Sequence, residues 1–396
     1  MIRHLFKMIW NKKKQNALML VEMLVSFLVV FAVFSLLVYN YQNYRRPVGI
    51  NYENVWVINY NNSDLDQSLD TVLMVREAIR REVLALPGVQ SASFTSNNLP
   101  FSMSQNNNGL THNKKFLGMV NHYTSDDFYD DVLGFPVIEG RWFTKADLSS
   151  GKFEPVLINE SLKQAAFGSG SALGKTLGDP SPSDRPRRVI GVIGDIKYKG
   201  DYQAPEYAMY MRADTGSYRW LSRIMVKVSP DAGADLESKM FKLVANSLKK
   251  SNVEIEHLSE KRVSRNSLAL VPMIILLIVA GFLIINVALG LFGVLWYNIS
   301  RRKGEIGLRR AVGASSNAVS KQLVGEAVML STLALLIGSF FAVQFPLLKL
   351  FDLPADVYGY AWFYAVLFIY LLVLICAFYP GKQAAAIHPA VALHEE

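Results

Sequence analysis

The sequence contains very little of what an enzyme or a metal protein uses. Cys376 is the only cysteine, so no intrachain disulfide is possible, and its place in an apolar run indicates a buried thiol. It therefore gives no information on the redox compartment. The six histidines have no metal-ligand spacing; they are His4, His112, His122, His257, His388 and His394. A Ser/His/Asp set, an H-E-x-x-H motif and a paired-carboxylate arrangement are also missing. We predict no catalytic residues and no metal site.

A nucleotide-binding loop is missing as well. The segment Ser169–Thr176 reads SGSALGKT and resembles the phosphate-loop pattern G-x-x-x-x-G-K-[ST]. The first glycine of that pattern would have to stand at Ser169, and Gly168 and Gly170 miss it by one position. We interpret the segment as a turn-rich loop. We expect the chain itself to bind no ATP, no Mg²⁺ and no other cofactor.

Charged residues are scarce, at 19%, against 51% hydrophobic residues and a mean hydropathy of +0.20. These values indicate an integral membrane protein with a substantial water-exposed part. A net charge of +8 is also common in nucleic-acid-binding proteins. Here the excess positive charge belongs to short segments that flank apolar runs, while residues 42–266 are nearly balanced. We therefore expect no nucleic-acid partner and use the charge to predict topology.

Four long apolar runs predict four transmembrane helices. They cover residues 17–41, 268–298, 322–350 and 358–379. A cleaved signal peptide is the alternative for the first run, but its apolar core is too long and no small-x-small cleavage site follows. The second run would be roughly 45 Å long as a helix, against a hydrocarbon core of ~30 Å. We therefore expect this helix to project beyond the membrane.

The Lys and Arg residues beside these runs predict which segments face the cytoplasm. Glu22 and Glu326 fall near the cytoplasmic ends of the first and third runs. An intramembrane carboxylate is a candidate functional site, but both lie close enough to the interface to snorkel or to pair with a basic residue. We see no proton relay. The predicted order is a cytoplasmic segment with the first span (1–41), an external domain (42–266), the second span (267–298), a cytoplasmic segment (299–321), the third span (322–350), an external loop (351–357), the fourth span (358–379) and a cytoplasmic tail (380–396).

The predicted external domain has similar patterns at its two ends. Residues 54–60, 70–86 and 89–95 predict a strand, an amphipathic helix and a second strand, and the same order recurs over 223–228, 232–249 and 253–257. Two such units far apart in the chain indicate a split α/β subdomain built from residues 54–96 and 222–259. Residues 97–221 are rich in glycine, proline, asparagine and short β-like runs. They predict a β-rich subdomain inserted into the first.

The most patterned polar segment lies between the second and third runs. Residues 301–321 hold six basic residues and one acid, Glu305, yet Ile306, Leu308 and Val312 interrupt the charges. Gly313, followed by alanine and serine, predicts the end of a short helix. A short amphipathic helix between two spans is well placed to contact a cytoplasmic partner.

This segment resembles the MacB/FtsX/LolC-E family of ABC-transporter permeases. Members carry E-I-G-[IL]-R-[RK]-A-[LV]-G-A-[ST] after the second span, and Glu305–Ser315 reads EIGLRRAVGAS. The pair Glu326-Ala327 and the tail Tyr379–Leu393 also match, although Gly381 replaces the usual alanine. Similar external segments are Leu86–Val89, Glu139–Phe143 and Gly191–Asp195.

The resemblance implies an α-helical membrane protein with four transmembrane helices and a large α/β extracytoplasmic domain. The split α/β part would be porter-like, and the inserted β-rich part Sabre-like. The implied partner is an ABC ATPase that binds ATP and Mg²⁺, expected on a separate polypeptide because only sixteen residues precede the first run. Other implied partners are a second permease as homodimer or heterodimer, a periplasmic adaptor with an outer-membrane exit duct, and membrane lipids. The implied location is the bacterial inner membrane, with both termini cytoplasmic.

The implied function is mechanotransmission, in which ATPase closure moves the external domain to export or extract a peptide, an antibiotic or a lipoprotein. Ile306 and Leu308 would insert into an ATPase groove, while Arg309 and Arg310 would pair with acidic groups there or with lipid phosphates. The full coupling set would be Glu305, Ile306, Gly307, Leu308, Arg309, Arg310, Gly313 and Ala314. Two alternatives stay open: an FtsX-like regulator of a cell-wall hydrolase and a membrane-anchored sensor.

Overall fold

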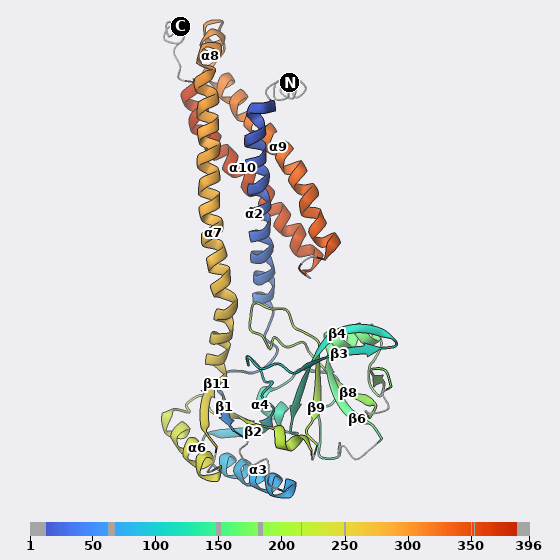
Figure 1. Cartoon of the computed structure of the whole chain (residues 1–396). Helices are drawn as coiled ribbons and strands as arrows, with labels where there is room; N and C mark the ends of the chain where they lie inside the picture. The colour runs from blue at the N-terminus through green and yellow to red at the C-terminus, as the bar shows by residue number, and fades with distance from the viewer. Residues whose placement is uncertain are drawn as a thin grey trace. The chain divides into compact units, whose positions relative to one another are not determined.

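The chain forms two compact units in its computed structural model. The membrane unit comprises Met1–Gln42 and Leu270–Glu396, and the external domain comprises Asn43–Ala269. Figure 1 shows the elements of both units in chain order by colour. The structure describes residues 13–61, 68–147, 152–180, 185–214, 216–248, 251–349, 351 and 353–385.

The membrane unit is built from long apolar helices, as predicted. Within the described residues, four helices are long and apolar enough to cross a membrane: α2 (Lys13–Arg45), α7 (Leu258–Arg301), α9 (Ser316–Leu348) and α10 (Ala355–Ala385). The short helix α8 (Lys303–Ala311) lies between α7 and α9 in the chain. At 44 residues, α7 would be about 66 Å long, more than twice the hydrocarbon core. It begins at Leu258, before the predicted second span, and continues as one helix to Arg301.

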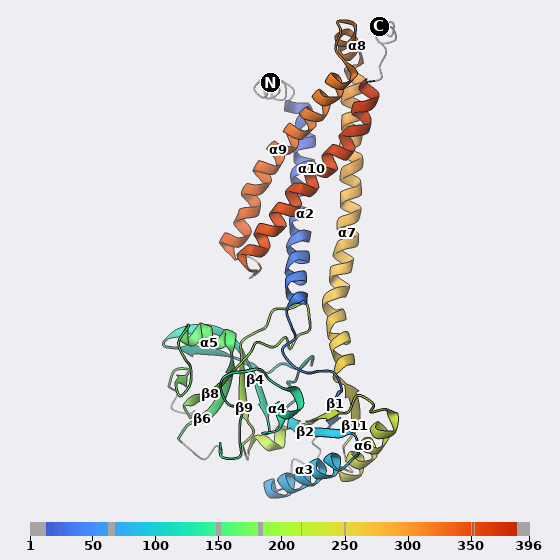
Figure 2. The same cartoon turned by 180° about the vertical axis from the view of Figure 1, so that it is seen from behind.

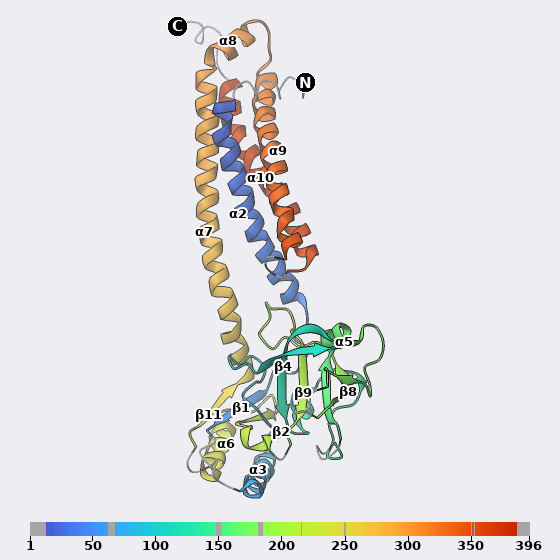
Figure 3. The ribbon, with the colours of Figure 1, turned by 45° about the vertical axis from the view of Figure 1, so that its right-hand side comes forward.

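Helices α9 and α10 lie side by side in all three views, and α2 packs against both (Figures 1, 2 and 3). Phe27 and Phe31 of α2 stack on each other, and Phe31 also stacks on Tyr358 of α10. Small residues on α10, Ala361 and Ala365, are fully buried and let the helices approach closely. Helix α7 is covered least by the chain, with 6% of its most apolar stretch buried against 33% in each of the other three. Its apolar side chains are therefore available to lipid.

The external domain contains one mixed sheet with the strand order β11-β1-β10-β2-β4-β9-β6-β8-β5; β3 pairs with β4, and β7 pairs with β8. Its strands are β1 (Val55–Tyr60), β2 (Val89–Thr95), β3 (Asn107–His112), β4 (Lys115–Ser125), β5 (Val137–Gly140), β6 (Glu154–Asn159), β7 (Thr176–Leu177), β8 (Arg187–Ile193), β9 (Ala208–Arg212), β10 (Arg223–Val228) and β11 (Val253–His257). Its helices are α3 (Leu69–Leu84), α4 (Tyr129–Leu133), α5 (Glu160–Phe167) and α6 (Ala234–Ser247), with a 3₁₀ turn at Ser217–Trp220.

The two ends of the external domain form the predicted split α/β arrangement. Strand β10 lies between β1 and β2, and β1 lies between β10 and β11, with antiparallel pairing throughout. Helices α3 and α6 therefore each connect two parallel strands that are separated by one strand. Strand β1 alternates its side chains: Trp56 and Ile58 belong to one core cluster with residues of α3 and α6, and Val55 and Val57 to another. Both faces of the strand are therefore buried.

The middle of the external domain forms the other half of the same sheet. Strands β4 and β9 are parallel, as are β6 and β8. One residue pair, Thr95 with Ser125, joins β2 to β4 and so connects the two halves. A shared core cluster includes Val57 and Met225 from the split half and Tyr123 and Tyr210 from the middle half. The two predicted parts are thus linked by one sheet and one core.

Candidate coupling site

Helix α8 has a well-defined C-terminal end that follows from its sequence. Gly313 adopts a φ of +101°, a conformation that L side chains rarely adopt. Its N–H bonds to the carbonyl of Arg310 at 3.1 Å, and the N–H of Ala314 bonds to that of Arg309 at 3.0 Å. This is the Schellman arrangement that ends many helices. Ser315 then caps α9, because its side chain accepts from the N–H of Ala318 at 3.3 Å. The predicted helix break is confirmed.

The two predicted apolar contact residues of α8 lie on opposite faces of the helix. Ile306 is only 3% exposed and packs with Ile299 and Val319 in the chain's own core. Leu308 is 57% exposed, and Val312, just after the helix, is 82% exposed. Residues two apart in a helix point in nearly opposite directions, so only one of this pair can face a partner. Ile306 is therefore not on the surface where we predicted a partner contact, and Leu308 is.

Two charged residues of α8, Glu305 and Arg309, belong to a closed network that we name the coupling ring. Arg302 contacts Glu305 through Nε at 3.0 Å and Glu326 through Nη1 at 2.8 Å. Glu326 accepts from Gln322 at 3.0 Å, and Gln322 accepts from Arg309 at 2.8 Å. Arg309 closes the ring on Glu305 at 2.6 Å. The ring joins the connection between α7 and α8 to the first turns of α9.

The buried part of the ring is the contact between Arg302 and Glu326. Their side chains are 12% and 17% exposed, whereas those of Arg309 and Glu305 are both 40% exposed. Burial acts to lower the pKa of Arg302, but hydrogen bonds with Glu305 and the charge of Glu326 outweigh it and raise the pKa. Arg302 therefore stays charged, and its planar guanidinium can hold two carboxylates at once.

The remaining predicted residues have different surroundings. Glu326 pairs with a basic residue near the end of its helix, as we expected of a carboxylate close to the interface. Glu22 is half-buried on α2, and its carboxylate lies against Gly290 of α7. Gly307 is buried beside Ile306 on the inward face of α8, while Arg310 and Ala314 are half-buried. Arg302 and Gln322 were not predicted as site residues, because their partners Glu326 and Arg309 lie 24 and 13 residues away in the chain.

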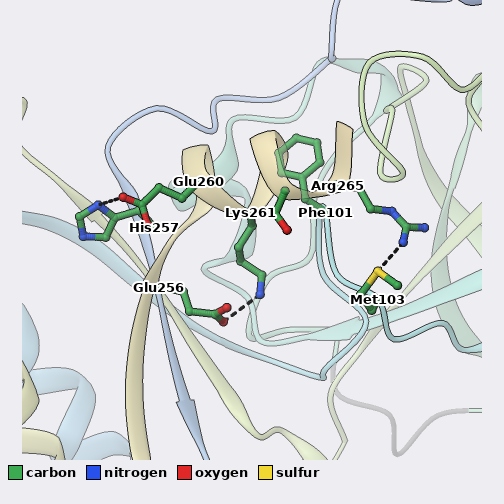
Figure 4. A pocket seen from close by; sticks show the side chains of 8 residues that line it. Phe101, Met103, Glu256, His257, Glu260, Lys261 and Arg265 are labelled. Atoms are coloured by element: carbon green, nitrogen blue, oxygen red, sulfur yellow. Dashed lines mark hydrogen bonds and ion pairs between the residues drawn. The ribbon is translucent and has the colours of Figure 1, made fainter. Parts of the chain in front are cut away.

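The external domain holds a second candidate, a cavity of about 290 Å³ beside the first turns of α7. Figure 4 shows Lys261 pointing toward Glu256, and Arg265 pointing toward Met103. Lys261 pairs with Glu256 at 2.8 Å, and Arg265 contacts the sulfur of Met103 at 2.7 Å. Because these charged groups already have partners within the chain, they do not need a ligand to supply a counter-charge. Among the residues that the structure describes, no group of His, Cys, Asp or Glu could hold a metal ion.

The segment that resembles a phosphate loop forms turns, as predicted. Residues 168–175 contain two turns that lead from α5 to β7. The ammonium of Lys175 lies 5.4 Å from the ring centre of Phe167. Strand β7, and not a helix, follows Lys175, so the loop does not lead into a helix N-terminus of the kind that binds phosphate in a phosphate loop.

Comparisons with known proteins agree with these features. Residues 17–241, more than half of the chain, match the family described as MacB-like periplasmic core domain, and residues 277–389 match FtsX-like permease C-terminal. The macrolide export ATP-binding/permease protein MacB of Aggregatibacter actinomycetemcomitans is 29% identical over 226 residues, which cover 55% of this chain and 34% of MacB. YvrN of Bacillus subtilis (strain 168), an uncharacterized ABC transporter permease, is 24% identical over 291 residues, covering 69% of this chain and 70% of YvrN.

Two solved structures are also similar to part of the chain. The periplasmic region of MacB from Actinobacillus actinomycetemcomitans has a TM-score of 0.39 and 22% identity, covering 55% of this chain and 94% of that one. The extracellular domain of the noncanonic ABC-type transporter YknZ from Gram-positive bacteria has a TM-score of 0.35 and 18% identity, with coverages of 51% and 100%. The chain spans about a third of the length of the MacB relative named above.

The part of the chain that the structure describes has four helices able to span a membrane, with a mixed-sheet domain between the first and second. These features define a multi-span membrane protein with a large external domain. Within that class, the chain belongs to the family of MacB-like and FtsX-like ABC-transporter permeases. The resemblance inferred from Glu305–Ser315 is thereby confirmed at the level of the family.

Proposed function

We propose that this chain is the permease subunit of a MacB-type ABC transporter and works by mechanotransmission. ABC ATPase subunits that bind ATP and Mg²⁺ would dock on α8 from the cytoplasm. Their closure would move α2 and α7, and these helices would carry the movement to the external domain. Two permease copies would act together, as a homodimer or a heterodimer. The work would be export or extraction of an extracytoplasmic substrate such as a peptide, an antibiotic or a lipoprotein.

The observation that carries this proposal is the exposed apolar end of a short, firmly held helix. Leu308 and Val312 are exposed, while the opposite face of α8 packs into the chain and the coupling ring ties it to α9. Exposed apolar side chains on a polar, basic segment are a common sign of a docking surface. A helix that is itself held to a span can pass a push on this surface to the membrane helices.

The family supports the same proposal. FtsX-like and MacB-like permeases are ABC-transporter components, and the name of the MacB relative includes both an ATP-binding and a permease function. For this chain we propose that the ATP-binding function belongs to partner subunits in the cytoplasm. A periplasmic adaptor and an outer-membrane exit duct would join the complex if the transported substrate leaves the cell.

The test is copurification of an ABC ATPase with the tagged full chain from native membranes, quantified with ATP hydrolysis. Leu308→Asp and Val312→Asp place a charge in the proposed apolar contact, and we expect about tenfold less bound ATPase. Membrane insertion and thermal stability of the permease should stay unchanged, since both side chains are exposed.

Two further variants separate docking from folding. Met74→Asp changes an exposed apolar residue of α3 and should leave ATPase binding at the parent level. Ile306→Asp places the charge in the chain's own core, so it should lower the stability of α8 as well as ATPase binding. Parent-level ATPase binding by both Leu308→Asp and Val312→Asp would reject α8 as the docking site.

A further inference from the structure

Strand β11 forms one end of the sheet in the external domain. In the part of this domain that the structure describes, β11 pairs only with β1, so its other edge has no neighbouring strand. Such an edge is a template for another strand, and many proteins protect it with proline, lysine or a bulge. Residues 253–257 read VEIEH, and their register with β1 is regular throughout. The backbone of this edge is therefore suited to accept a strand.

The two faces of β11 differ in chemistry. Alternate side chains of a strand point to opposite faces. Val253 and Ile255 lie with residues of α6 in one apolar cluster. Glu254 and Glu256 point to the other face, where Glu254 is exposed and Glu256 is half-buried. The edge thus has an apolar face next to α6 and an acidic face opposite.

A groove of about 330 Å³ lies between α6 and this edge. Ile255 lines it from β11, and four residues of α6 that share one helix face line it from the other side: Ala234, Glu237, Ser238 and Phe241. Phe241 is 44% exposed, and Figures 1 and 3 show α6 beside β11 at this end of the sheet. A strand added ~4.8 Å from β11 can turn alternate side chains into this groove.

Carboxylates are in excess around the edge. Four lie on β11 or beside it, those of Glu237, Glu254, Glu256 and Glu260. Lys261 pairs with Glu256 at 2.8 Å, and Arg223 lies two strands away on β10. Opposite charges across neighbouring strands stabilise a sheet, and like charges destabilise it. The edge therefore favours a strand that places lysine or arginine on its acidic face.

The same charges disfavour a second copy of this chain. If two β11 strands paired antiparallel around Ile255, Glu254 of one copy would lie directly opposite the partner's Glu256, and the same contact would recur across the two-fold axis. Two like-charged pairs within so short a ladder are unfavourable. The glutamates thus protect the edge from self-pairing and leave it open to a basic strand.

We propose that β11 is a strand-acceptor edge that binds an extended, basic peptide segment. Apolar residues of the segment would alternate with lysine or arginine, the apolar ones entering the groove beside Phe241 and the basic ones lying opposite Glu254. Main-chain hydrogen bonds supply the affinity in this mode of recognition, and alternate side chains supply the specificity. The inference goes beyond the proposed function, because binding at this edge requires neither an ATPase nor movement of the membrane helices.

The experiment uses the full chain in nanodiscs of phosphatidylcholine, which has no net charge and so attracts a basic peptide weakly. The probe is a fluorescent peptide of sequence Lys-Val-Lys-Val-Lys-Val-Lys. Fluorescence anisotropy measures binding, and hydrogen exchange in residues 253–257 reports where the peptide binds. We expect saturable binding, with exchange in this strand slowed about tenfold. A peptide with glutamate in place of lysine should bind about tenfold more weakly.

A second peptide tests the backbone contact. It carries the same side chains but is N-methylated at the residues that face β11, so it cannot donate main-chain hydrogen bonds. It should bind about tenfold more weakly than the parent peptide. Equal binding of the two peptides would overturn strand addition. This measurement needs no protein variant, so it does not depend on how a substitution affects folding.

Two protein variants test the edge itself. Glu254→Lys should reverse the charge preference, so that the glutamate peptide binds more tightly than the lysine peptide. Phe241→Ala removes the apolar wall of the groove and should weaken binding of both peptides about fivefold. Both side chains are exposed, so the fold should persist. The matched control is Glu160→Lys, an exposed charge on α5 in the other half of the sheet, which should leave binding unchanged.

Three results would overturn the proposal. The first is unaltered exchange in residues 253–257 when the lysine peptide is present. The second is an unchanged charge preference in Glu254→Lys. The third is exchange in this strand that slows with rising protein concentration in the absence of peptide, because a second copy of the chain would then occupy the edge.

Discussion

The coupling ring can be compared with the loop of residues 197–202 (KYKGDY), which binds the end of α2 through Lys197 and the first turns of α7 through Asp201. We name the contacts of this loop the stalk clamp. The ring and the clamp are built from the same parts but differ in burial. Each joins an arginine to a carboxylate and an amide: Arg302, Glu326 and Gln322 in the ring, Arg262, Asp201 and Asn266 in the clamp. In the ring, Glu305 and Arg309 are 40% exposed, so water competes for their contact. In the clamp, the side chain of Asp201 is 5% exposed and has no such alternative. Loss of one clamp partner would leave a buried charge unpaired.

This difference suggests a division of work between the two regions. Around α8, the half-exposed pair of Arg309 and Glu305 can exchange with water at little cost, while the buried pair of Arg302 and Glu326 holds the helix to α9. Under the proposed function the stalk clamp passes the movement on, and its buried bidentate contact yields only at a high free-energy cost. We therefore expect substitutions in the ring to change how well α8 is held, and substitutions in the clamp to separate ATP hydrolysis from movement outside.

The largest expected effect concerns the two sides of the membrane on which these regions lie. Single cysteines at residues 316 and 238, in a Cys376→Ser background, should react with an impermeant thiol reagent from opposite faces. Residue 316 begins α9 in the basic segment, and residue 238 is exposed on α6 of the external domain. The result is all or none for each site. Labelling of both residues from the same face would show that the two regions lie on the same side of the membrane and would reject the predicted topology.

The next effect distinguishes the buried and the exposed contacts within the ring. Glu326→Gln should weaken the hold on α8 by about 1.5 kcal/mol, because Arg302 loses a charged partner at a mostly buried site. Amide exchange in residues 303–311 should then be roughly tenfold faster. Glu305→Gln removes the more exposed partner and should have a smaller effect. Equal effects of the two substitutions would show that burial does not set the strength of the ring.

Much of this architecture was predictable because it depends on local pattern. Period-2 and period-3.6 runs located the strands and helices at both ends of the external domain, and Gly313 located the end of α8. The face of α8 was not predictable, because the roles of Ile306 and Leu308 depend on how neighbouring helices pack. The clamp was not predictable either: KYKGDY reads as an ordinary loop until folding brings Arg262, 61 residues from Asp201, beside it.

The smallest expected effect tests whether the external domain is rigid through its own core as well as through the clamp. Burial, with the charge of Arg187 second, lowers the pKa of His122 to about 4. Its unfolded value is near 6.5, so between these pH values the unfolded state binds more protons. The stability contributed by neutral His122 is therefore present above pH 6.5 and is lost as the pH falls toward 4. His122→Gln should remove this loss.

Asp126 has the opposite dependence. Burial raises its pKa to about 6, although N–H donors from Phe94 and Phe128 and the hydroxyl of Ser93 act against the shift. Between pH 3.8 and 6 the folded state binds more protons, so stability falls as the pH rises through this window. Thermal unfolding of the external domain in the full chain, followed by tryptophan fluorescence from pH 4 to 7, should separate the two groups. His122→Gln should make the midpoint fall with rising pH, and Asp126→Asn should make it rise more steeply. In both variants the distribution of distances between spin labels at residues 41 and 263, both more than half exposed, should keep its parent width at every pH where the domain is folded, since neither side chain belongs to the clamp. If the width of this distribution, measured by pulsed electron resonance, changed together with the unfolding midpoint, the core, and not the clamp, would hold the helix ends.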